Sequence, residues 1–252
     1  MHRFFLPPEA ARGPIVELSG EEAHHAARVL RLRRGDPVAV LDGAGGELAC
    51  VVADVAGGRV RLEVSARRVV PAPAWRLTLL QALPKGKLFE SIVQKATELG
   101  VARIVPVLSE RVIAQLDDRK AAARQADWQQ VAVEACKQCG QAWLPRVEAP
   151  ATPAALLARA ESWDLPLVAS LQPGSRHPRA CFEDYRAAHG RAPASVCVWV
   201  GPEGDFTAAE IEAITAGGAR PITLGPLVLR VETAAVYCLS VLNYELQAGG
   251  GH

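Results

Sequence analysis

A short turn rich in glycine carries the residues best suited to chemistry. Gly-Pro-Glu-Gly at positions 201–204 follows the apolar run Ser195–Val200, which suits a strand buried on both faces of a parallel sheet. Ligands bind at the carboxyl ends of strands in an open α/β sheet, so the turn lies where a site is expected. The glycines allow the backbone to approach a ligand closely, although a plain tight turn explains them equally well. Glu203 is harder to explain by turn chemistry, so it is a candidate functional group.

A second candidate segment lies between residues 221 and 235. A strand that begins at Pro221 gives way to a loop with a Gly-Pro step, and Arg230 and Glu232 then lead into an apolar helix that continues through Leu246. A carboxylate in the first turn of a helix is favoured by the helix dipole. Capping and catalysis therefore explain Glu232 equally well.

Beyond residue 74 the sequence alternates between strand and helix patterns, and these elements could position the two candidate segments. Thr207 and Glu210 form a capping box that starts a helix directly after the glycine turn. Gly100 is placed to end an earlier helix. The expected strands are 77–83, 103–108, 165–171 and 195–200, and the expected helices include 88–99 and 124–138. Alternating strands and helices predict an α/β domain with a parallel sheet.

The first 70 residues predict a small β-rich unit that resembles a barrel. Its expected strands are 38–42, 47–55 and 59–64, separated by glycine turns. One helix is expected among them, since Ser19 and Glu22 have the spacing of a capping box and Gly35 can end the helix. Two prolines in residues 70–74 favour an extended linker.

Composition restricts the class of protein. Of the 252 residues, 50% are hydrophobic and 22% are charged, which is an ordinary globular balance and excludes a disordered chain. No apolar run is long enough to span a bilayer, and prolines interrupt the opening segment before a secretory signal can form. A cytoplasmic protein that does not bind membranes is expected. Cys136 and Cys139 form a CxxC without a second pair, so neither a metal nor a disulfide framework is expected.

Positive charge is concentrated locally. The formal net charge is +1, which argues against a uniformly basic surface for nucleic acid. However, residues 24–34 contain four arginines and no acid, and basic residues recur between 85 and 111. Such patches can bind phosphates. A solvated helix face is the simpler explanation for the arginine run considered alone.

Several motifs together resemble one family. They are His2–Phe5, 24–31, Lys95–Gly100, Glu134–Cys136, 201–204 and Leu229–Ala234. The glycine turn and the segment before the last helix resemble the SPOUT superfamily of methyltransferases. The N-terminal motifs and 95–100 narrow the resemblance to the RsmE family, the 16S ribosomal RNA uridine-N3 methyltransferases, over essentially the whole chain.

This resemblance implies a fold, a reaction and a set of partners. The implied domains are a PUA-like RNA-binding β-barrel at 1–72 and a SPOUT methyltransferase domain at 73–252, whose C-terminal segment forms a deep trefoil knot. The implied reaction is S-adenosylmethionine-dependent methylation of N3 of a specific uridine in 16S ribosomal RNA. The implied partners are this RNA or the small ribosomal subunit, and a second copy of the chain in a homodimer.

The resemblance also implies roles for individual residues. Arg230, Glu232 and Glu203 are the candidate catalytic residues. Arg230 would stabilise the uridine anion, and either glutamate would act as a base or an orienting group. The residues implied in cofactor binding are Ser170, Leu171, Gly201, Pro202, Glu203, Gly204, Leu224, Gly225 and Leu229. The residues implied in RNA binding are Arg3, His25, Arg28, Arg31, Lys85, Lys87, Lys95 and Arg111.

The chain departs from the family pattern at four positions. Asp205 stands where the family usually has a second glycine, and Leu227 stands where the family often has a basic residue. Cys139 and Gln141 stand where serine and arginine are more frequent. Two other functions share some of these features, namely a knotted ribose 2′-O-methyltransferase acting on transfer RNA and a non-enzymatic RNA-binding or ribosome-assembly protein.

Overall fold

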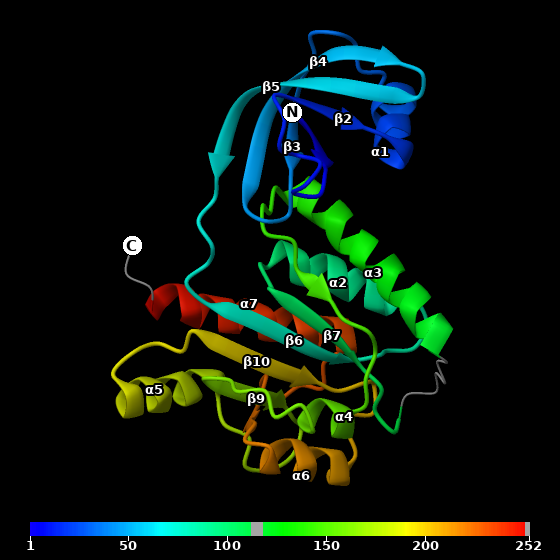
Figure 1. Ribbon diagram of the computed structural model, residues 1–252. Coiled ribbons are helices and arrows are strands. Elements are labelled where there is room, and N and C mark those ends of the chain that lie inside the picture. Colours follow the sequence, from blue (N-terminus) through cyan, green and yellow to red (C-terminus); the bar gives the residue numbers. More distant parts are fainter. Residues whose placement is uncertain (112–117, 250–252) are drawn as a thin grey trace. The chain divides into compact units, whose positions relative to one another are not determined.

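The computed structural model describes residues 1–111 and 118–249, and the chain divides into two compact units (Figure 1). The first unit comprises Met1–Ala72 and Val133–Leu144, and the second comprises Pro73–Ala132 and Pro145–His252. Residues 133–144, which the sequence assigns to the second domain, therefore group with the first unit. The indole N–H of Trp143 explains part of this difference, because it donates to the carbonyls of Val70 at 3.2 Å and Pro71 at 3.1 Å.

The first unit is built on a five-stranded sheet with the order β1-β3-β4-β5-β2. The strands are β1 (His2–Phe5), β2 (Ile15–Leu18), β3 (Pro37–Leu41), β4 (Gly46–Ala56) and β5 (Arg59–Val69). β1 is parallel to β3 and the other pairs are antiparallel. Alternate residues of β4 and β5 are buried, among them Leu48 and Leu62, and they pack with Phe4 and Val40 in one core. Among the described residues, strand pairing ends at β1 and β2, so the sheet is open where the sequence predicts a barrel-like unit.

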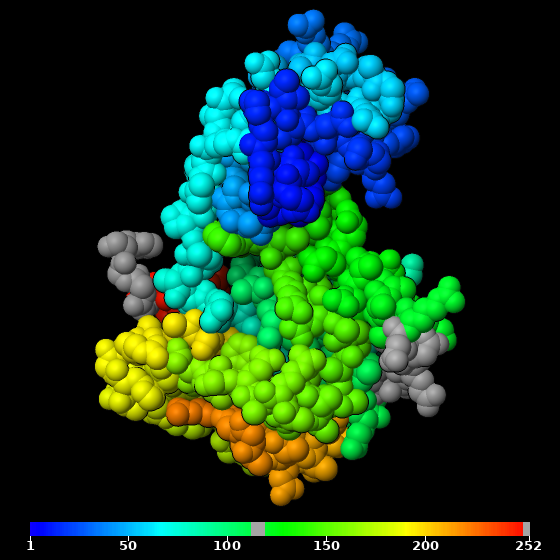
Figure 2. Space-filling view, viewed as in Figure 1, coloured from blue at the N-terminus to red at the C-terminus, as the bar shows by residue number. Residues whose placement is uncertain are grey.

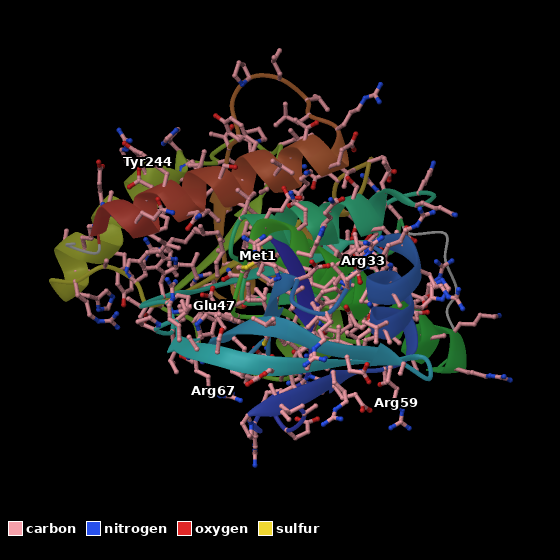
Figure 3. All side chains as sticks on the ribbon, turned by 90° about the horizontal axis from the view of Figure 1, so that it is seen from above. Met1, Arg33, Glu47, Arg59, Arg67 and Tyr244 are labelled. Atoms are coloured by element: carbon pink, nitrogen blue, oxygen red, sulfur yellow. The ribbon has the colours of Figure 1, made fainter. Side chains whose placement is uncertain are left out.

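The exposed side chains of β5 are mostly polar. Figure 3 shows Arg59 and Arg67 near opposite ends of β5. Arg59 pairs with Glu17 of β2 at 3.1 Å, and Arg67 donates to the carbonyls of Ala11 and Gly13, both at 2.6 Å. These contacts join the edge strand and the first loop to the rest of the sheet.

The helix expected between Ser19 and Gly35 is shorter than predicted. It consists of α1 (Gly20–His24) and a π-helical turn, η1 (His25–Val29). The predicted capping box is wrong, because the Ser19 side chain forms no capping hydrogen bond and the Glu22 carboxylate instead lies 2.7 Å from the Lys137 ammonium. The helix ends before Arg31, whose φ of 54° is left-handed.

The second unit contains a six-stranded sheet with the order β11-β9-β10-β6-β7-β8. Its strands are β6 (Arg76–Ala82), β7 (Arg103–Val107), β8 (Arg146–Val147), β9 (Leu165–Ala169), β10 (Ser195–Val200) and β11 (Arg220–Ile222). Its helices are α2 (Leu88–Glu98), α3 (Asp118–Cys139, whose last residues group with the first unit), α4 (Pro153–Leu157), α5 (Pro178–His189), α6 (Ala208–Ala216) and α7 (Val231–Gly249). All the strand pairs are parallel, so the predicted α/β fold with a parallel sheet is confirmed.

Helices cover both faces of this sheet, which explains why its central strands are continuously apolar. Leu156 of α4 and Ile214 of α6 pack with strand residues such as Val168 and Trp199 on one face. α7 packs against α2, β6 and β10 on the other (Figure 1). In Figure 2, α6 lies on the surface of the second unit. The capping box predicted for Thr207 and Glu210 is present in full.

The sheet brings the ends of three sequence-distant strands together. β10 pairs with β9, and β11 pairs with the other side of β9. β9 ends at Ala169, two residues earlier than expected, and the Ser170 N–H donates to the Ile222 carbonyl at 3.0 Å. The loops after β9, β10 and β11 therefore leave from neighbouring positions at one edge of the sheet. No helix in residues 1–111 and 118–249 has the length and apolar character needed to cross a membrane.

Candidate functional site

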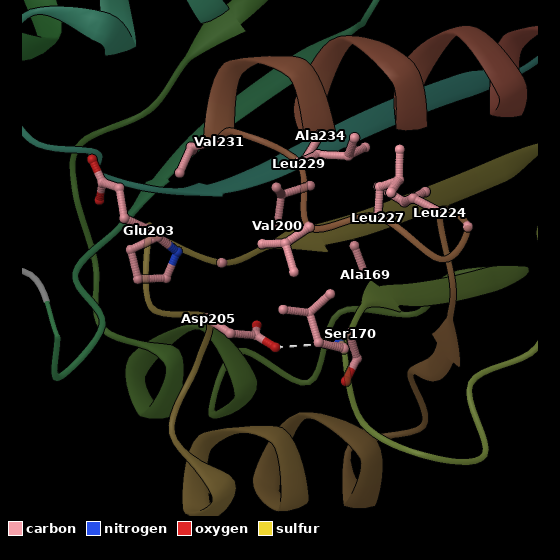
Figure 4. Close-up of a pocket in the computed structure, with 15 residues that line it drawn as sticks. Ala169, Ser170, Val200, Glu203, Asp205, Leu224, Leu227, Leu229, Val231 and Ala234 are labelled. Carbon is pink, nitrogen blue, oxygen red and sulfur yellow. Dashed lines mark hydrogen bonds between the residues drawn. The ribbon is translucent and has the colours of Figure 1, made fainter.

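A cavity lies at the carboxyl ends of β9, β10 and β11, bordered by the start of α7 (Figure 4). Its empty volume is about 570 Å³, part of which is open solvent. The lining residues are Ala169, Ser170, Leu171, Val200, Gly201, Pro202, Glu203, Asp205, Leu224, Gly225, Leu227, Val228, Leu229, Val231 and Ala234. Most are apolar and a few are polar, which is the usual composition of a small-molecule site.

The cavity brings together eight of the nine residues that the sequence assigns to cofactor binding. Gly204 is the exception. It lies beside Arg111, whose side chain would be 3.4 Å from a Cβ atom at that position. Sequence reasoning did not assign Asp205 to the cavity, whereas Leu227 and Val228 lie inside the loop 224–229 that the resemblance assigns to the cofactor. The position of Asp205 directly after the predicted glycine turn was the available signal.

Gly201 is required by close packing inside the glycine turn. A Cβ atom at this position would lie 2.7 Å from Asp205 Oδ1, which is closer than such atoms approach in proteins, and a tight 3.0 Å from the Phe206 nitrogen. The turn is closed by a hydrogen bond from the Asp205 N–H to the Pro202 carbonyl at 2.9 Å. Asp205 itself has a φ of 62°.

Glu203 joins the glycine turn to the loop that follows β6. Its Oε1 accepts a hydrogen bond from the Lys85 backbone N–H at 2.9 Å. One carboxylate oxygen of this cavity residue is therefore engaged in holding a loop whose exposed lysines, Lys85 and Lys87, flank Gly86. An orienting role for Glu203 uses the oxygen that already accepts this hydrogen bond, whereas a role as base would use the other oxygen.

Arg230 and Glu232 flank the cavity in sequence, but their side chains are not among the lining residues. They alternate with Leu229 and Val231, which do line it. The Arg230 carbonyl accepts the first hydrogen bond of α7 from Ala234 at 2.8 Å, and its side chain is exposed. Glu232 is half-buried in the first turn of α7, where the helix dipole favours a carboxylate.

The predicted RNA-binding residues of the first unit have different environments. Arg3 Nη1 donates to the carbonyls of Lys137 at 3.3 Å and Gln138 at 3.1 Å, so it caps the C-terminal end of α3. His25 packs edge-on against Phe4, with ring centroids 6.3 Å apart. Two other predicted residues, Arg28 and Arg31, are exposed, and neither forms an ion pair within the described part of the chain.

The predicted RNA-binding residues of the second unit also differ in availability. Lys95 pairs with Glu98 one turn away at 3.0 Å. Arg111 lies against the glycine turn and donates weakly to the Asp205 carbonyl at 3.4 Å. Lys85 and Lys87 are exposed and form no ion pair among residues 1–111 and 118–249. These two lysines are therefore the more available cations of the set.

The charged side chains that line the cavity favour a ligand with positive character. The charged lining residues are Glu203 and Asp205, both acidic. The apolar rim is exposed, since Leu171, Leu227 and Val228 expose 62%, 73% and 78% of their surface. Exposed apolar side chains gathered at one cavity suit a ligand with an apolar face.

The two cysteines of the CxxC differ in their burial. Burial, together with the nearby Cys139, raises the pKa of Cys136 to about 12, so it is protonated at neutral pH. Cys139 is exposed, and its thiol contacts the Cys136 carbonyl at 3.9 Å. Within the described ranges, no cluster of three or more His, Cys, Asp or Glu side chains is arranged to hold a metal ion.

The chain matches two family descriptions. Residues 71–243 match the RNA methyltransferase domain, and residues 18–65 match the RNA methyltransferase PUA domain.

Two relatives carry the same name, ribosomal RNA small subunit methyltransferase E. That of Bacillus subtilis is 30% identical over 98% of this chain and 98% of its own length. That of Synechocystis is 33% identical over 98% of this chain and 78% of its own length.

Two solved structures are similar to almost the entire chain. A methyltransferase from Legionella pneumophila, in complex with the bound cofactor SAM, has a TM-score of 0.85 and 33% identity over 99% of this chain and 98% of that one. Ribosomal RNA small subunit methyltransferase E from Neisseria gonorrhoeae, bound to S-adenosyl methionine, has a TM-score of 0.83 and 27% identity over 97% of each chain.

Proposed function

The chain belongs to the family of ribosomal RNA small subunit methyltransferase E, and from this premise we propose that it methylates small-subunit ribosomal RNA with S-adenosylmethionine as methyl donor. The observation that carries the proposal is the cavity at the ends of β9, β10 and β11, which eight of the nine expected cofactor residues line. Solved relatives that hold S-adenosylmethionine support the choice of cofactor.

The residues of the cavity fit this cofactor. S-adenosylmethionine supplies a methyl group activated by a positively charged sulfur. The carboxylates of Glu203 and Asp205 favour a cation, while Leu171, Leu227 and Val228 provide apolar surface for a planar ring. The exposed loops also provide backbone N–H and carbonyl groups that can bind the polar edge of an adenine. The cofactor would be held by Ser170, Leu171, Gly201, Pro202, Glu203, Gly204, Leu224, Gly225 and Leu229, with Gly204 acting through the shape of the turn.

Uridine N3 is the target atom in this proposal. N3 carries a proton and becomes a good nucleophile only when that proton leaves, so the site needs a means to stabilise the anion. Arg230 lies between the lining residues Leu229 and Val231, and its guanidinium is assigned to the developing negative charge on the uracil oxygens. The target base would swing out of its stack to reach the cavity.

The two glutamates have different roles in this scheme. Glu203 already accepts a hydrogen bond from the Lys85 N–H, so it is assigned to orient the loop at 84–87. Glu232 is half-buried near Arg230 in the chain and is assigned as the proton acceptor.

RNA binding would involve both units. Residues 1–72 are assigned as the PUA-like RNA-binding domain and residues 73–252 as the SPOUT methyltransferase domain. Of the RNA residues, Arg28, Arg31, Lys85 and Lys87 are exposed and pair with no acid among the described residues. Their cations are assigned to phosphate, and phosphate contacts position the RNA without reading its bases. Arg3, His25, Lys95 and Arg111 contribute mainly by shaping these surfaces. The proposed substrate is 16S ribosomal RNA, either free or within the small ribosomal subunit. A cytoplasmic location is part of the same proposal.

The trefoil knot and the homodimer belong to the proposal as well. The pairing of β11 beside β9, followed by the loop to α7 and the packing of α7 on β6 and β10, supports a knotted C-terminal segment. α7 also exposes 47% of Tyr237 and 63% of Tyr244; Tyr244 is labelled in Figure 3. Large exposed tyrosines are typical of protein interfaces, which supports α7 as the dimer contact.

The test uses small-subunit RNA from cells that lack this protein. Purified enzyme and S-adenosylmethionine should add one methyl group, recovered as 3-methyluridine in nucleoside mass spectrometry. Arg230→Ala should lower the rate by at least about a hundredfold, as loss of a charge-stabilising donor does, with cofactor affinity unchanged. Arg76→Ala is the matched control, because this exposed arginine lies at the amino end of β6.

Three results would contradict parts of the proposal. Methylation of a ribose 2′-oxygen would refute the N3 assignment, and normal activity of Arg230→Ala would refute the role of that residue. Failure of the wild-type protein to bind S-adenosylmethionine in calorimetry would refute the enzyme and indicate a binding protein.

A further inference from the structure

We propose that Asp205 is a positioning residue that braces the cofactor cavity by joining the loop after β9 to the glycine turn after β10. The inference rests on the proposed function, because it assigns cofactor affinity to this brace. The brace itself is a feature of the protein alone and can be measured without RNA.

The Asp205 carboxylate bridges two backbone segments that are distant in sequence. Its Oδ1 accepts the Phe206 N–H at 2.8 Å, and its Oδ2 accepts the Leu171 N–H at 3.3 Å, the bond drawn dashed in Figure 4. Hydrogen bonds to an ionised group are stronger than those between neutral groups. The carboxylate can therefore hold both segments at one wall of the cavity.

The two segments differ in how firmly they are anchored. The Phe206 side chain is only 2% exposed and packs edge-on against Trp199 of β10. The Leu171 side chain is 62% exposed, so packing does little to hold that residue. The brace consequently transfers the rigidity of the buried turn to the exposed loop, whose backbone forms part of the cavity wall.

The backbone of the turn is shaped to present this carboxylate. Asp205 has a φ of 62°, a left-handed conformation that few residues other than glycine, asparagine and aspartate tolerate. The absence of a side chain at Gly201 leaves the space that Oδ1 occupies, since a Cβ atom there would lie 2.7 Å from it. Gly201 and Asp205 therefore form a matched pair, and the carboxylate adds a contact that a glycine at 205 cannot supply.

Two substitutions separate the brace from the turn. Asp205→Asn keeps a residue that tolerates the left-handed conformation and keeps an acceptor for the Phe206 N–H, but its amide then directs N–H groups at the Leu171 N–H. Asp205→Gly keeps the backbone conformation and removes both hydrogen bonds. Asp127→Asn, on the exposed surface of α3, is the control for loss of one negative charge.

Isothermal titration with S-adenosylmethionine and amide hydrogen exchange at Leu171 together test the brace. Asp205→Asn and Asp205→Gly should each raise the Kd by roughly tenfold, the size expected for loss of a charge-assisted hydrogen bond. Exchange at Leu171 should accelerate in both variants without cofactor, whereas exchange in β6 and Tm should match Asp127→Asn. If Asp205→Gly proves poorly folded, Asp205→Asn decides the outcome.

The inference is overturned if both variants bind the cofactor within twofold of wild type, or if affinity falls while exchange at Leu171 does not change. Failure of the proposed function gives a different result, because the wild-type protein would then not bind S-adenosylmethionine. The acceleration of Leu171 exchange would in that case still show the brace, and its absence would refute it.

Discussion

Replacing Lys137 by alanine should destabilise the first unit by about 2–3 kcal/mol. Lys137 is 8% exposed, and its ammonium lies 2.7 Å from Glu22 Oε1 and 2.8 Å from Glu134 Oε1. Burial alone would lower the pKa of Lys137, but the hydrogen bonds that its ammonium donates to Glu134 and Glu22 outweigh burial and raise the pKa. The lysine is therefore charged in the folded protein, and its removal leaves Glu22 without its cation.

The magnitude follows from the exposure of the two carboxylates. Removing one partner of a fully buried pair costs about 3–5 kcal/mol, because the other charge is left uncompensated. Glu22 is 18% exposed and its Oε2 is buried without a hydrogen-bond partner among the described residues, so most of that cost should remain. Glu134 is 54% exposed and should contribute little, since water replaces its partner.

Urea unfolding followed by circular dichroism measures the decrease in the free energy of unfolding. Amide exchange in β3, which belongs to the first unit, and in α2, which belongs to the second, shows which unit is destabilised. Lys95→Ala is the matched control, because this lysine also pairs with a glutamate three residues away but on an exposed surface. It should cost less than about 0.5 kcal/mol. A Glu22→Gln, Lys137→Met double variant should recover part of the stability. Equal losses for Lys137→Ala and Lys95→Ala, or no recovery in the double variant, would refute this reasoning.

Three further predictions concern other surfaces. The Arg191 guanidinium, followed by backbone N–H groups, holds the pKa of Asp164 well below its usual range. Asp164→Asn should therefore lower the free energy of unfolding by about 1–2 kcal/mol above pH 5. In acid titrations of unfolding, the difference from wild type should shrink below about pH 4, where the carboxylate begins to be protonated in the unfolded chain. Cys139 is the exposed thiol, so Cys139→Ser should abolish rapid labelling by a thiol reagent at pH 8, and persistent labelling would contradict the assigned burial of the others. Lys87→Ala should weaken RNA binding and lower the slope of log affinity against log salt by about 0.7–0.9, whereas Arg76→Ala should change neither; equal slopes in filter binding would exclude a phosphate contact by Lys87.

The strands and helices of the second unit could be predicted from the sequence because the patterns that indicate them are local. The unbroken apolar run of β10 predicted a strand covered on both faces, and the Thr207–Glu210 box predicted the start of α6, as observed. The glycine turn could be placed at the sheet edge because parallel strands end together there. Asp205, which directly follows the glycine turn, could have been assigned to the cavity by the same reasoning.

Features that depend on long-range contacts could not be predicted in this way. Ser19 and Glu22 have the spacing of a capping box, but the buried ammonium of Lys137 competes successfully for the carboxylate. Arg3 belongs to a basic motif, yet the free carbonyls at the end of α3 bind its guanidinium. The bridging role of Asp205 depends on the Leu171 N–H, 34 residues away in the chain. No local pattern reveals which distant group will lie beside such side chains.

The return of residues 133–144 to the first unit has a consequence for biosynthesis. A nascent chain released only as far as Ala72 lacks the segment that contains Lys137 and Trp143, so its five-stranded sheet has neither the cation for Glu22 nor the indole at Val70. Domains usually mature in the order of their translation. Here the N-terminal unit must wait until residue 144 has left the exit tunnel, by which time residues 73–132, about a third of the other unit, have already left it.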